Sequence, residues 1–429
     1  MSPAPPGPGT AARPRPGPGT VTGATGVPHL REVLAAAAVS SGLHLHGTVP
    51  GALTHDQSCR AARSWGLGQD PGGTVLVMAD GLGLELLLQR RGHAPTLRSW
   101  LAEAESAPTL EATTCAPTTT AAALTTLGTS ALPGTTGMVG YSVVNPAHQP
   151  LPPDATPCRE HLLCLISWEG QDAPAPRAWQ DVPTVFERLR PGARRPAPLA
   201  VAVTPARFAG SGLTEAALRG ARHVGADRLE DRPAHAVRAL RRGGPLVYLY
   251  VGELDHAGHA HGWRSQQWLT QLERLDRALD HLLRAVPAGT RVVLTADHGM
   301  VDTDADHRVT VTDHPDLVRD VTAVAGEPRL TSLCVRGSDP DLAHEVARRW
   351  RDHLGQAALW VGTREQSAAL LGPLSPRARG VVGDVLVAMA GSWVVVDPRV
   401  HAPAAMALPG VHGSLTRAET SVPLLVRRA

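Results

Sequence analysis

The segment from Leu246 to Gly299 has the pattern of a strand, a long helix and a second strand. LVYLY at 246–250 and RVVLTADHG at 291–299 both contain apolar runs of strand length. Between them, SQQWLTQLERLDRALDHLLRAV at 265–286 repeats apolar residues at three- and four-residue steps, as an amphipathic helix does. This order predicts a parallel βαβ unit with a right-handed crossover, and therefore an α/β fold.

Three apolar strands each lead to an aspartate. VLVMAD ends on Asp80, the strand at 246–250 runs on to Asp255, and RVVLTAD ends on Asp297. Open α/β sheets build their sites at the carboxyl ends of their strands, so these three carboxylates are expected to lie together.

Histidines accompany these aspartates. His298 follows Asp297 directly, and the segment Asp255-x-x-Gly258-His259 predicts a glycine-containing turn that points Asp255 and His259 at one ion. His412, near the C-terminus, adds a third imidazole. Three aspartates and three histidines are enough for two ions, and this ligand mixture suits zinc or manganese better than calcium.

A candidate nucleophile lies in APTTTAAALT at 116–125. The alanines predict a helix, and a threonine at its N-terminus would sit where backbone N–H groups and the helix dipole favour an anion. Bound to a metal, its hydroxyl could ionise and attack phosphorus. The alternative is that Thr118 or Thr119 is only an N-cap, and the local sequence leaves both interpretations open.

Size and composition exclude several classes of protein. The 429 residues allow one large α/β domain with insertions or two domains. A net charge of +2 with 19% charged residues does not indicate binding to a nucleic-acid polymer. The chain contains no lysine, which rules out a lysine nucleophile or Schiff base.

The cysteine pattern and hydropathy predict a cytoplasmic protein that does not bind membranes. The five cysteines are scattered and form no CxxC pair, which argues against a disulfide framework or a zinc-thiolate site. No apolar run reaches the roughly 18 residues that span a membrane, and no signal pattern is present. The oligomeric state is not determined by the sequence.

Two regions differ from the rest. Residues 1–28 are dense in Pro and Gly and are expected to be a disordered tail, which leaves 29–429 as one catalytic domain. Residues from about 305 to 395 alternate short strands with one helix at 340–354 and are interpreted as a small α+β cap insertion that shapes the substrate pocket. The Pro-rich segment 145–180 is expected to form a long loop or small hairpin near the site.

The motifs together resemble a known family. Asp80-Gly81, the PTTT segment, DxxGHxxG at 255–262, Asp297-His298-Gly299 and His412-Gly413 occur in the order found in the alkaline phosphatase superfamily. The resemblance is greatest to its nucleotide pyrophosphatase/phosphodiesterase (type I phosphodiesterase) branch and covers about residues 70–415. It implies an alkaline-phosphatase-like sandwich, with a central, mostly parallel sheet between helices.

The resemblance also implies a site and a reaction. One Zn²⁺ would be held by Asp255, His259 and His412, and the other by four groups: Asp80, Asp297, His298 and the nucleophile Thr120. Mn²⁺ or another divalent metal is an alternative. The enzyme would hydrolyse small phosphate esters, most of all phosphodiester or pyrophosphate bonds, through a phospho-threonine. A nucleotide is one candidate substrate.

One position departs from the family. Nucleotide-hydrolysing relatives place an asparagine that donates to a phosphate oxygen where this chain has Tyr141. A tyrosine hydroxyl could donate the same bond from further away, so Tyr141 is assigned to substrate binding while nucleotide diesters become less certain. The rival functions are a phosphomonoesterase, a phosphonate hydrolase, a phosphomutase, or a metal-stabilised binding protein without turnover.

Three further polar residues are candidates for supporting roles. Glu253 is expected to orient His259, and Arg207 and Arg264 could each meet a phosphate, although a surface position is the simpler interpretation for both arginines.

Overall fold

The computed structural model describes residues 26–68, 72–105, 107, 109–190 and 198–429. The tail predicted at 1–28 therefore lies outside the described residues as far as position 25.

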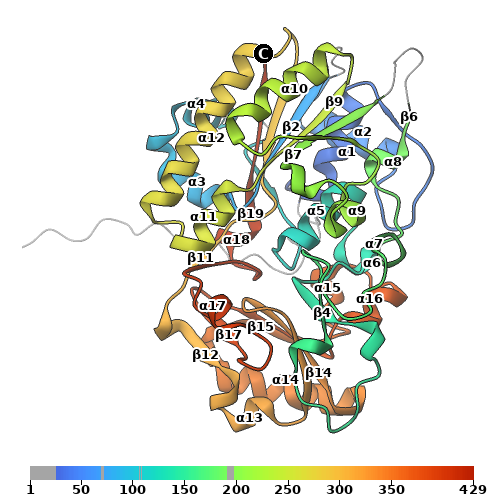
Figure 1. The fold of residues 1–429 in the computed structure, drawn as a ribbon, viewed down its shortest axis with the longest axis vertical. Helices are drawn as coiled ribbons and strands as arrows, with labels where there is room; N and C mark the ends of the chain where they lie inside the picture. Colours follow the sequence, from blue (N-terminus) through green and yellow to red (C-terminus); the bar gives the residue numbers. More distant parts are fainter. Residues whose placement is uncertain (1–25, 69–71, 106, 108, 191–197) are drawn as a thin grey trace, which may run out of the picture.

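A seven-stranded, mostly parallel sheet forms the centre of the protein, and its strand order is β3-β19-β10-β2-β9-β7-β8 (Figure 1). The parallel strands are β2 (Thr74–Ala79), β7 (Ala200–Thr204), β8 (Arg222–Gly225), β9 (Leu246–Val251) and β10 (Arg291–Thr295). Two strands run antiparallel at one side: β19 (Ser421–Arg428) pairs with β10, and β3 (Glu111–Thr113) pairs with β19. The predicted α/β class is confirmed.

The predicted strand-helix-strand unit is present, but its two strands are not adjacent in the sheet, because a third strand lies between them. Helix α12 (Gln266–Ala285) begins where the Ser265 hydroxyl accepts from Trp268 N at 3.1 Å, and it joins β9 to β10. Strand β2 lies between β9 and β10 and is parallel to both. Its central place gives Asp80 neighbours from both flanking strands.

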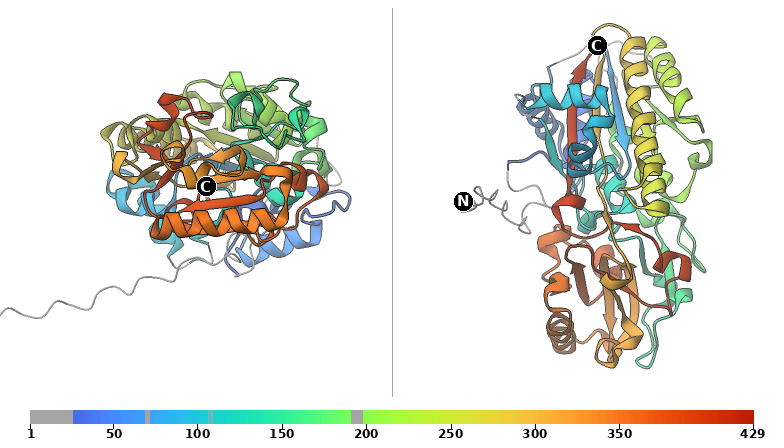
Figure 2. Two further views of the ribbon diagram at one scale, coloured as in Figure 1. Left: turned by 90° about the horizontal axis from the view of Figure 1, so that it is seen from below. Right: turned by 90° about the vertical axis from the view of Figure 1, so that its left-hand side faces the viewer.

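Helices cover both faces of this sheet, as the right-hand view of Figure 2 shows. One face carries α10 (Arg232–Arg241) and α12, and the other carries α1 (Leu30–Ser40), α3 (Leu84–Arg90) and α4 (Pro95–Ala104). The apolar stripe of α12 is buried in this core, since Trp268, Leu272 and Leu279 are at most 2% exposed. The sheet is thus the middle layer of a sandwich.

A second, smaller sheet lies beyond the carboxyl ends of the parallel strands (Figure 1). Its four antiparallel strands have the order β13-β14-β16-β15, from β13 (Val321–Glu327), β14 (Leu330–Val335), β15 (Ala358–Thr363) and β16 (Val385–Met389). Helix α14 (Pro340–Leu354) packs on it and buries Trp350 completely in a separate apolar core. This sheet falls within the segment predicted as a cap insertion.

The Pro-rich segment predicted at 145–180 contributes the second strand and the connection of a hairpin whose first strand directly precedes it. Strand β4 (Ser142–Val144) pairs antiparallel with β5 (Leu162–Cys164), and a long connection joins them. No helix in the described part of the chain is long and apolar enough to cross a membrane.

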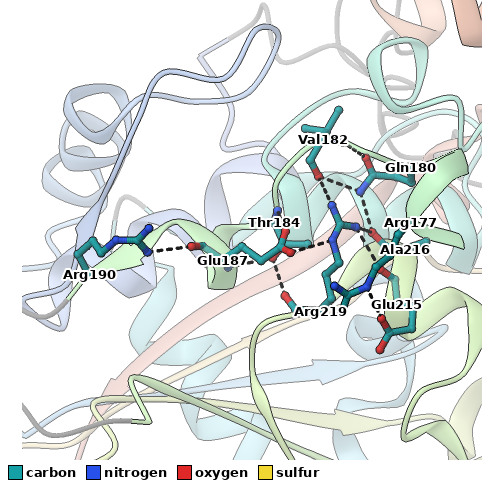
Figure 3. A network of polar contacts seen from close by, with 9 residues as sticks. All are labelled: Arg177, Gln180, Val182, Thr184, Glu187, Arg190, Glu215, Ala216 and Arg219. Carbon is teal, nitrogen blue, oxygen red and sulfur yellow. Dashed lines mark hydrogen bonds and ion pairs between the residues drawn. The ribbon is translucent and has the colours of Figure 1, made fainter.

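Helix α5 (Thr120–Thr129), which begins with the candidate nucleophile, packs against α9, and a polar network surrounds α9 (Figure 3). Its Gly128 lies so close to α9 (Gly212–Ala217) that a Cβ there would be 1.9 Å from the Ala217 carbonyl oxygen. The Arg219 guanidinium, next to α9, donates to the carbonyl oxygens of Val182 and Ala216 and to the Glu187 carboxylate. This network fixes α9 and therefore the position of α5.

Candidate metal centre

Two of the three predicted aspartates lie at adjacent strand ends, and the third follows on a helix. Asp80 follows β2 and Asp297 follows β10, and both side chains are buried. Asp255 lies on α11 (Glu253–His261), directly after β9. Gly81 has a φ of +74°, and its N–H donates to Asp297 Oδ1 at 3.1 Å. Its missing side chain also leaves room for Asp255, whose Cβ would lie 3.1 Å from a Cβ at this position.

The glycine-containing turn predicted between Asp255 and His259 is wrong, because this segment is helical. The two residues are one turn apart on α11, and His259 Nε2 lies 3.5 Å from Asp255 Oδ2. A helix places side chains four residues apart on the same face. Gly258 serves packing instead, since a Cβ there would lie 2.2 Å from Met300 Sδ.

His412 joins the site from β18 (Gly410–Val411), after the chain returns from the smaller sheet. Its Nε2 lies 3.2 Å from His259 Nε2 and 3.7 Å from Asp255 Oδ1. Its ring stacks on His298, with 3.7 Å between the ring centroids. The structure thus brings His412 next to His298, 114 positions earlier in the sequence, and next to His259, 153 positions earlier.

All three histidines direct the same nitrogen into the site. Nδ1 of His259, His298 and His412 lies at 2.8, 3.0 and 2.7 Å from the backbone carbonyl oxygens of Gly410, Gly299 and Thr118, respectively. A carbonyl oxygen can only accept, so each Nδ1 carries the proton and each Nε2 keeps its lone pair. Backbone carbonyls often fix metal-binding histidines in this way.

The ligand atoms form two overlapping groups. Asp80, Asp297 and His298 offer atoms that all lie within 4.8 Å of one another, and so do Asp255, His298 and His412. Oδ1 of Asp80, Oδ1 of Asp255 and Oδ2 of Asp297 are buried and have no hydrogen-bond partner among the described residues. Three buried carboxylate oxygens without donors fit divalent cations, because a buried charge otherwise requires a partner.

The pKa shifts of the clustered side chains also favour a bound cation. Burial, and then the neighbouring carboxylates Asp297 and Asp255, raise the pKa of Asp80 well above its usual value. Burial, followed by the neighbouring His298 and His259, lowers the pKa of His412. Without a metal ion, the surroundings therefore disfavour both the ionised carboxylate of Asp80 and the protonated imidazole of His412. A bound cation would stabilise ionised carboxylates beside neutral imidazoles.

The three threonines of the PTTT segment have different surroundings. The Thr118 hydroxyl donates to Ser414 O at 2.9 Å and accepts from Gly413 N at 3.0 Å, which ties it to the loop after His412. Thr119 is the N-cap of α5, but its side chain makes no capping hydrogen bond. Thr120 Oγ1 lies 3.2 Å from His298 Nε2, so Thr120 is the threonine that faces the candidate metal ligands.

Sequence reasoning missed Tyr250 and misassigned Glu253. The Tyr250 hydroxyl donates to Asp80 Oδ2 and so orients this carboxylate. The prediction that Glu253 orients His259 is wrong, because both Glu253 oxygens accept from the buried Arg232, at 2.7 and 2.9 Å. Arg232 also donates to Tyr250 O at 3.1 Å and thereby fixes the start of α11. The only signal in the sequence was the alternation of Tyr248 and Tyr250 along an apolar strand, which places a polar hydroxyl group on one face of that strand.

A cavity of about 770 Å³ opens beside these residues, and Asp80, Thr120, Asp255 and His259 line it. Tyr141 does not line this cavity, and its residue is 48% exposed.

Glu327, at the end of β13, is a buried acid near the site. Both its oxygens are buried without a hydrogen-bond partner among the described residues, and its Cγ would lie 2.5 Å from a Cβ at Gly413. Burial raises the pKa of Glu327 to about 8, and the nearby Thr119 hydroxyl and Tyr141 backbone only partly oppose this shift.

We expect Glu327→Gln to change the pH dependence of stability. Because the pKa is raised in the folded protein, from 4.5 to about 8, the native side chain holds a proton that the unfolded chain releases between these values. The wild type therefore loses stability as the pH rises through this range, and glutamine does not. Denaturant unfolding of the metal-free proteins measures this difference. As the pH rises through this range, the free energy of unfolding of the variant should increase by on the order of 3–5 kcal/mol relative to that of the wild type. A constant difference from pH 5 to 8 would contradict the assignment.

The fold and these residues define a class, that of α/β proteins with a candidate metal centre at the carboxyl edge of the sheet. The family model described as "Type I phosphodiesterase / nucleotide pyrophosphatase" matches residues 74–414, and the chain belongs to this family. It is thus a hydrolase of the phosphodiesterase and nucleotide pyrophosphatase kind. A comparison with curated protein sequences gave no match.

Solved structures share the fold at low sequence identity. Mouse ectonucleotide pyrophosphatase/phosphodiesterase 5 is 16% identical, with a TM-score of 0.59, and the match covers 82% of this chain and 87% of that one. The human protein is 15% identical, with a TM-score of 0.60 and coverage of 83% and 87%. Phosphonoacetate hydrolase from Sinorhizobium meliloti 1021, in complex with phosphonoformate, is 18% identical, with a TM-score of 0.59 and coverage of 84% and 91%.

Proposed function

We propose that this protein hydrolyses phosphate esters, and diesters in preference, with two zinc ions and Thr120 as nucleophile. The observation that carries the proposal is the convergence of three histidine Nε2 atoms on buried carboxylate oxygens that have no donor of their own. When bound, the two ions would stabilise the attacking and leaving oxygens of an in-line displacement.

We assign the ligands to two sets, although the group of closest atoms joins Asp255 and His412 to His298 and leaves His259 out. Asp255, His259 and His412 would hold one ion, since their ligand atoms are 3.2–3.7 Å apart. His298 is near both sets; we assign it to the second ion with Asp80 and Asp297, because its Nε2 is 3.6 and 3.4 Å from their oxygens. Thr120 would complete this second set, since its Oγ1 lies 3.2 Å from His298 Nε2.

Thr120 has the surroundings of a phosphate-binding nucleophile. It occupies the first turn of α5, where no side chain caps the free backbone N–H groups, so these groups and the helix dipole favour a phosphoryl anion. Attack by Thr120 Oγ1 would form an Oγ–P bond while the P–O bond to the leaving group breaks. Water would then cleave the Oγ–P bond and restore the hydroxyl. In support, a threonine-to-alanine variant of the mouse relative is described as inactive and binds AMP.

Tyr141 remains a substrate-binding proposal. Its ring lies outside the cavity beside Thr120, so its hydroxyl would reach a phosphate oxygen only after a movement of its side chain. Phosphonate hydrolysis is the second candidate function, because a phosphonoacetate hydrolase shares the fold over 84% of the chain.

A substrate panel tests the function. Zinc-loaded protein is expected to hydrolyse bis-p-nitrophenyl phosphate faster than p-nitrophenyl phosphate or phosphonoacetate. Chelation should abolish this activity and added zinc should restore it, with two ions per chain at full activity. Faster turnover of phosphonoacetate would favour the second candidate. Full metal loading without turnover of any of the three would favour a binding protein.

We also propose a cytoplasmic location. The five cysteines are free thiols in the structure, in keeping with a reducing compartment. Fractionation of the source cells, with activity in a secreted fraction as the contrary result, tests this.

A further inference from the structure

The cavity beside Thr120 is also lined by residues that directly follow β7. Pro205, Arg207 and Phe208 line this cavity together with Thr120 and Asp255. A substrate whose phosphorus lies at Thr120 would therefore direct one of its ester groups toward Arg207.

A series of contacts connects Arg207 with the site. The Arg207 guanidinium carbon lies 4.9 Å from the centre of the Phe208 ring, over its face. Phe208 packs edge-on against Tyr250, with 5.7 Å between the centroids, and the Tyr250 hydroxyl donates to Asp80. Stacking on a ring orients a guanidinium while leaving its N–H groups free to bind an acid.

Arg207 differs from the other arginines on this cavity. Arg232 pairs with Glu253 at 2.7 Å, and Arg274 pairs with Glu230 at 2.8 Å. In the part of the chain that the structure describes, Arg207 has no ion pair. Asp227, an acid that also lines this cavity, accepts a hydrogen bond from Ala206 N at 2.8 Å. Arg207 is thus the arginine of this cavity whose charge is available to a ligand.

We propose that Arg207 binds a second anionic group of the substrate, a carboxylate or a phosphate, on the ester group that extends from the scissile phosphorus. This inference rests on the proposed function and narrows the substrate class to esters that carry another acid. Arg264, the other arginine singled out in the sequence, does not share this role, because it pairs with Asp302 at 3.4 Å and lines a different cavity. Arg264 is therefore a matched control.

The test compares 4-nitrophenyl phosphodiesters that differ in one substituent. The second ester group is a phenyl or a benzyl group, and these two groups place the substituent at two distances from the phosphorus. The substituent is a carboxylate, a phosphonate or an uncharged carboxamide. For wild type, we expect kcat/KM to be about fivefold higher for an anionic ester than for the carboxamide, mainly through KM, as for an exposed ion pair. The carboxylate and phosphonate arms show which acid is preferred.

Arg207→Gln should remove this preference, Arg207→Glu should reverse it, and Arg264→Gln should keep it. Equal rates for all esters in wild type, or a preference that survives in Arg207→Gln, would overturn the proposal. If no ester is hydrolysed, the proposed function fails, and calorimetry then tests Arg207 separately. Zinc-loaded wild type should bind 4-carboxyphenyl phosphate more tightly than 4-carbamoylphenyl phosphate, and Arg207→Gln should not.

Discussion

Replacing Thr120 by alanine is expected to reduce hydrolysis of bis-p-nitrophenyl phosphate by a factor on the order of 10⁴ or more, as the loss of a covalent nucleophile does in other hydrolases. The reason is geometric, since Thr120 is the threonine whose hydroxyl faces the metal ligands, 3.2 Å from His298 Nε2. The initial rate of the variant should be measured with bound zinc quantified in the same preparation. Zinc near two ions per chain would exclude metal loss as the cause.

Two variants control this experiment. Thr119→Ala is expected to stay within about tenfold of wild type, because the Thr119 side chain makes no capping hydrogen bond. Thr120→Ser keeps the hydroxyl and should recover much of the activity. A Thr120→Ala protein as active as wild type would mean that Thr120 only begins a helix, and the covalent mechanism would be wrong.

The second large effect concerns stability. Arg329 and Glu419 form a fully buried ion pair, with both side chains 0% exposed and distances of 2.6 and 3.0 Å. Glu419→Gln would leave the Arg329 charge buried and uncompensated, which costs about 3–5 kcal/mol. Denaturant unfolding measures this loss. Asp352→Asn breaks the Arg348 pair, in which both side chains are 65% exposed, and should cost about 1 kcal/mol at most.

This ion pair also connects the smaller sheet to the metal ligands. Arg329 follows β13, and Glu419 accepts from Ser414 N at 2.9 Å, two residues after His412. We therefore expect Glu419→Gln to lower zinc affinity and activity as well. A double variant, Arg329→Met with Glu419→Leu, should recover part of the stability, because it removes the unpaired charge. Unchanged stability of Glu419→Gln would contradict the importance of this pair.

Much of the fold could be predicted because its central elements are periodic. The helix predicted at 265–286 is α12 at Gln266–Ala285, and the helix predicted at 340–354 coincides with α14. The short edge strands β3 and β8 lack an apolar run; all four residues of β8 are at least partly exposed. Their strand conformation depends on pairing with a neighbour that is distant in the sequence.

The candidate site residues could be predicted from the sequence, because a strand that ends on aspartate in an α/β fold places this residue at the carboxyl edge of the sheet. How these side chains meet depends on the packing of segments that are distant in the sequence. In the folded protein, β2 lies between β9 and β10, and Asp255 and His259 lie on one face of a helix. His412, which follows the segment that forms the smaller sheet, stacks on His298. The fold also gives Thr120 surroundings that differ from those of Thr118, and it places Arg207 and Arg264 on different cavities. Periodicity records local geometry, whereas these choices depend on packing between segments that no local pattern connects.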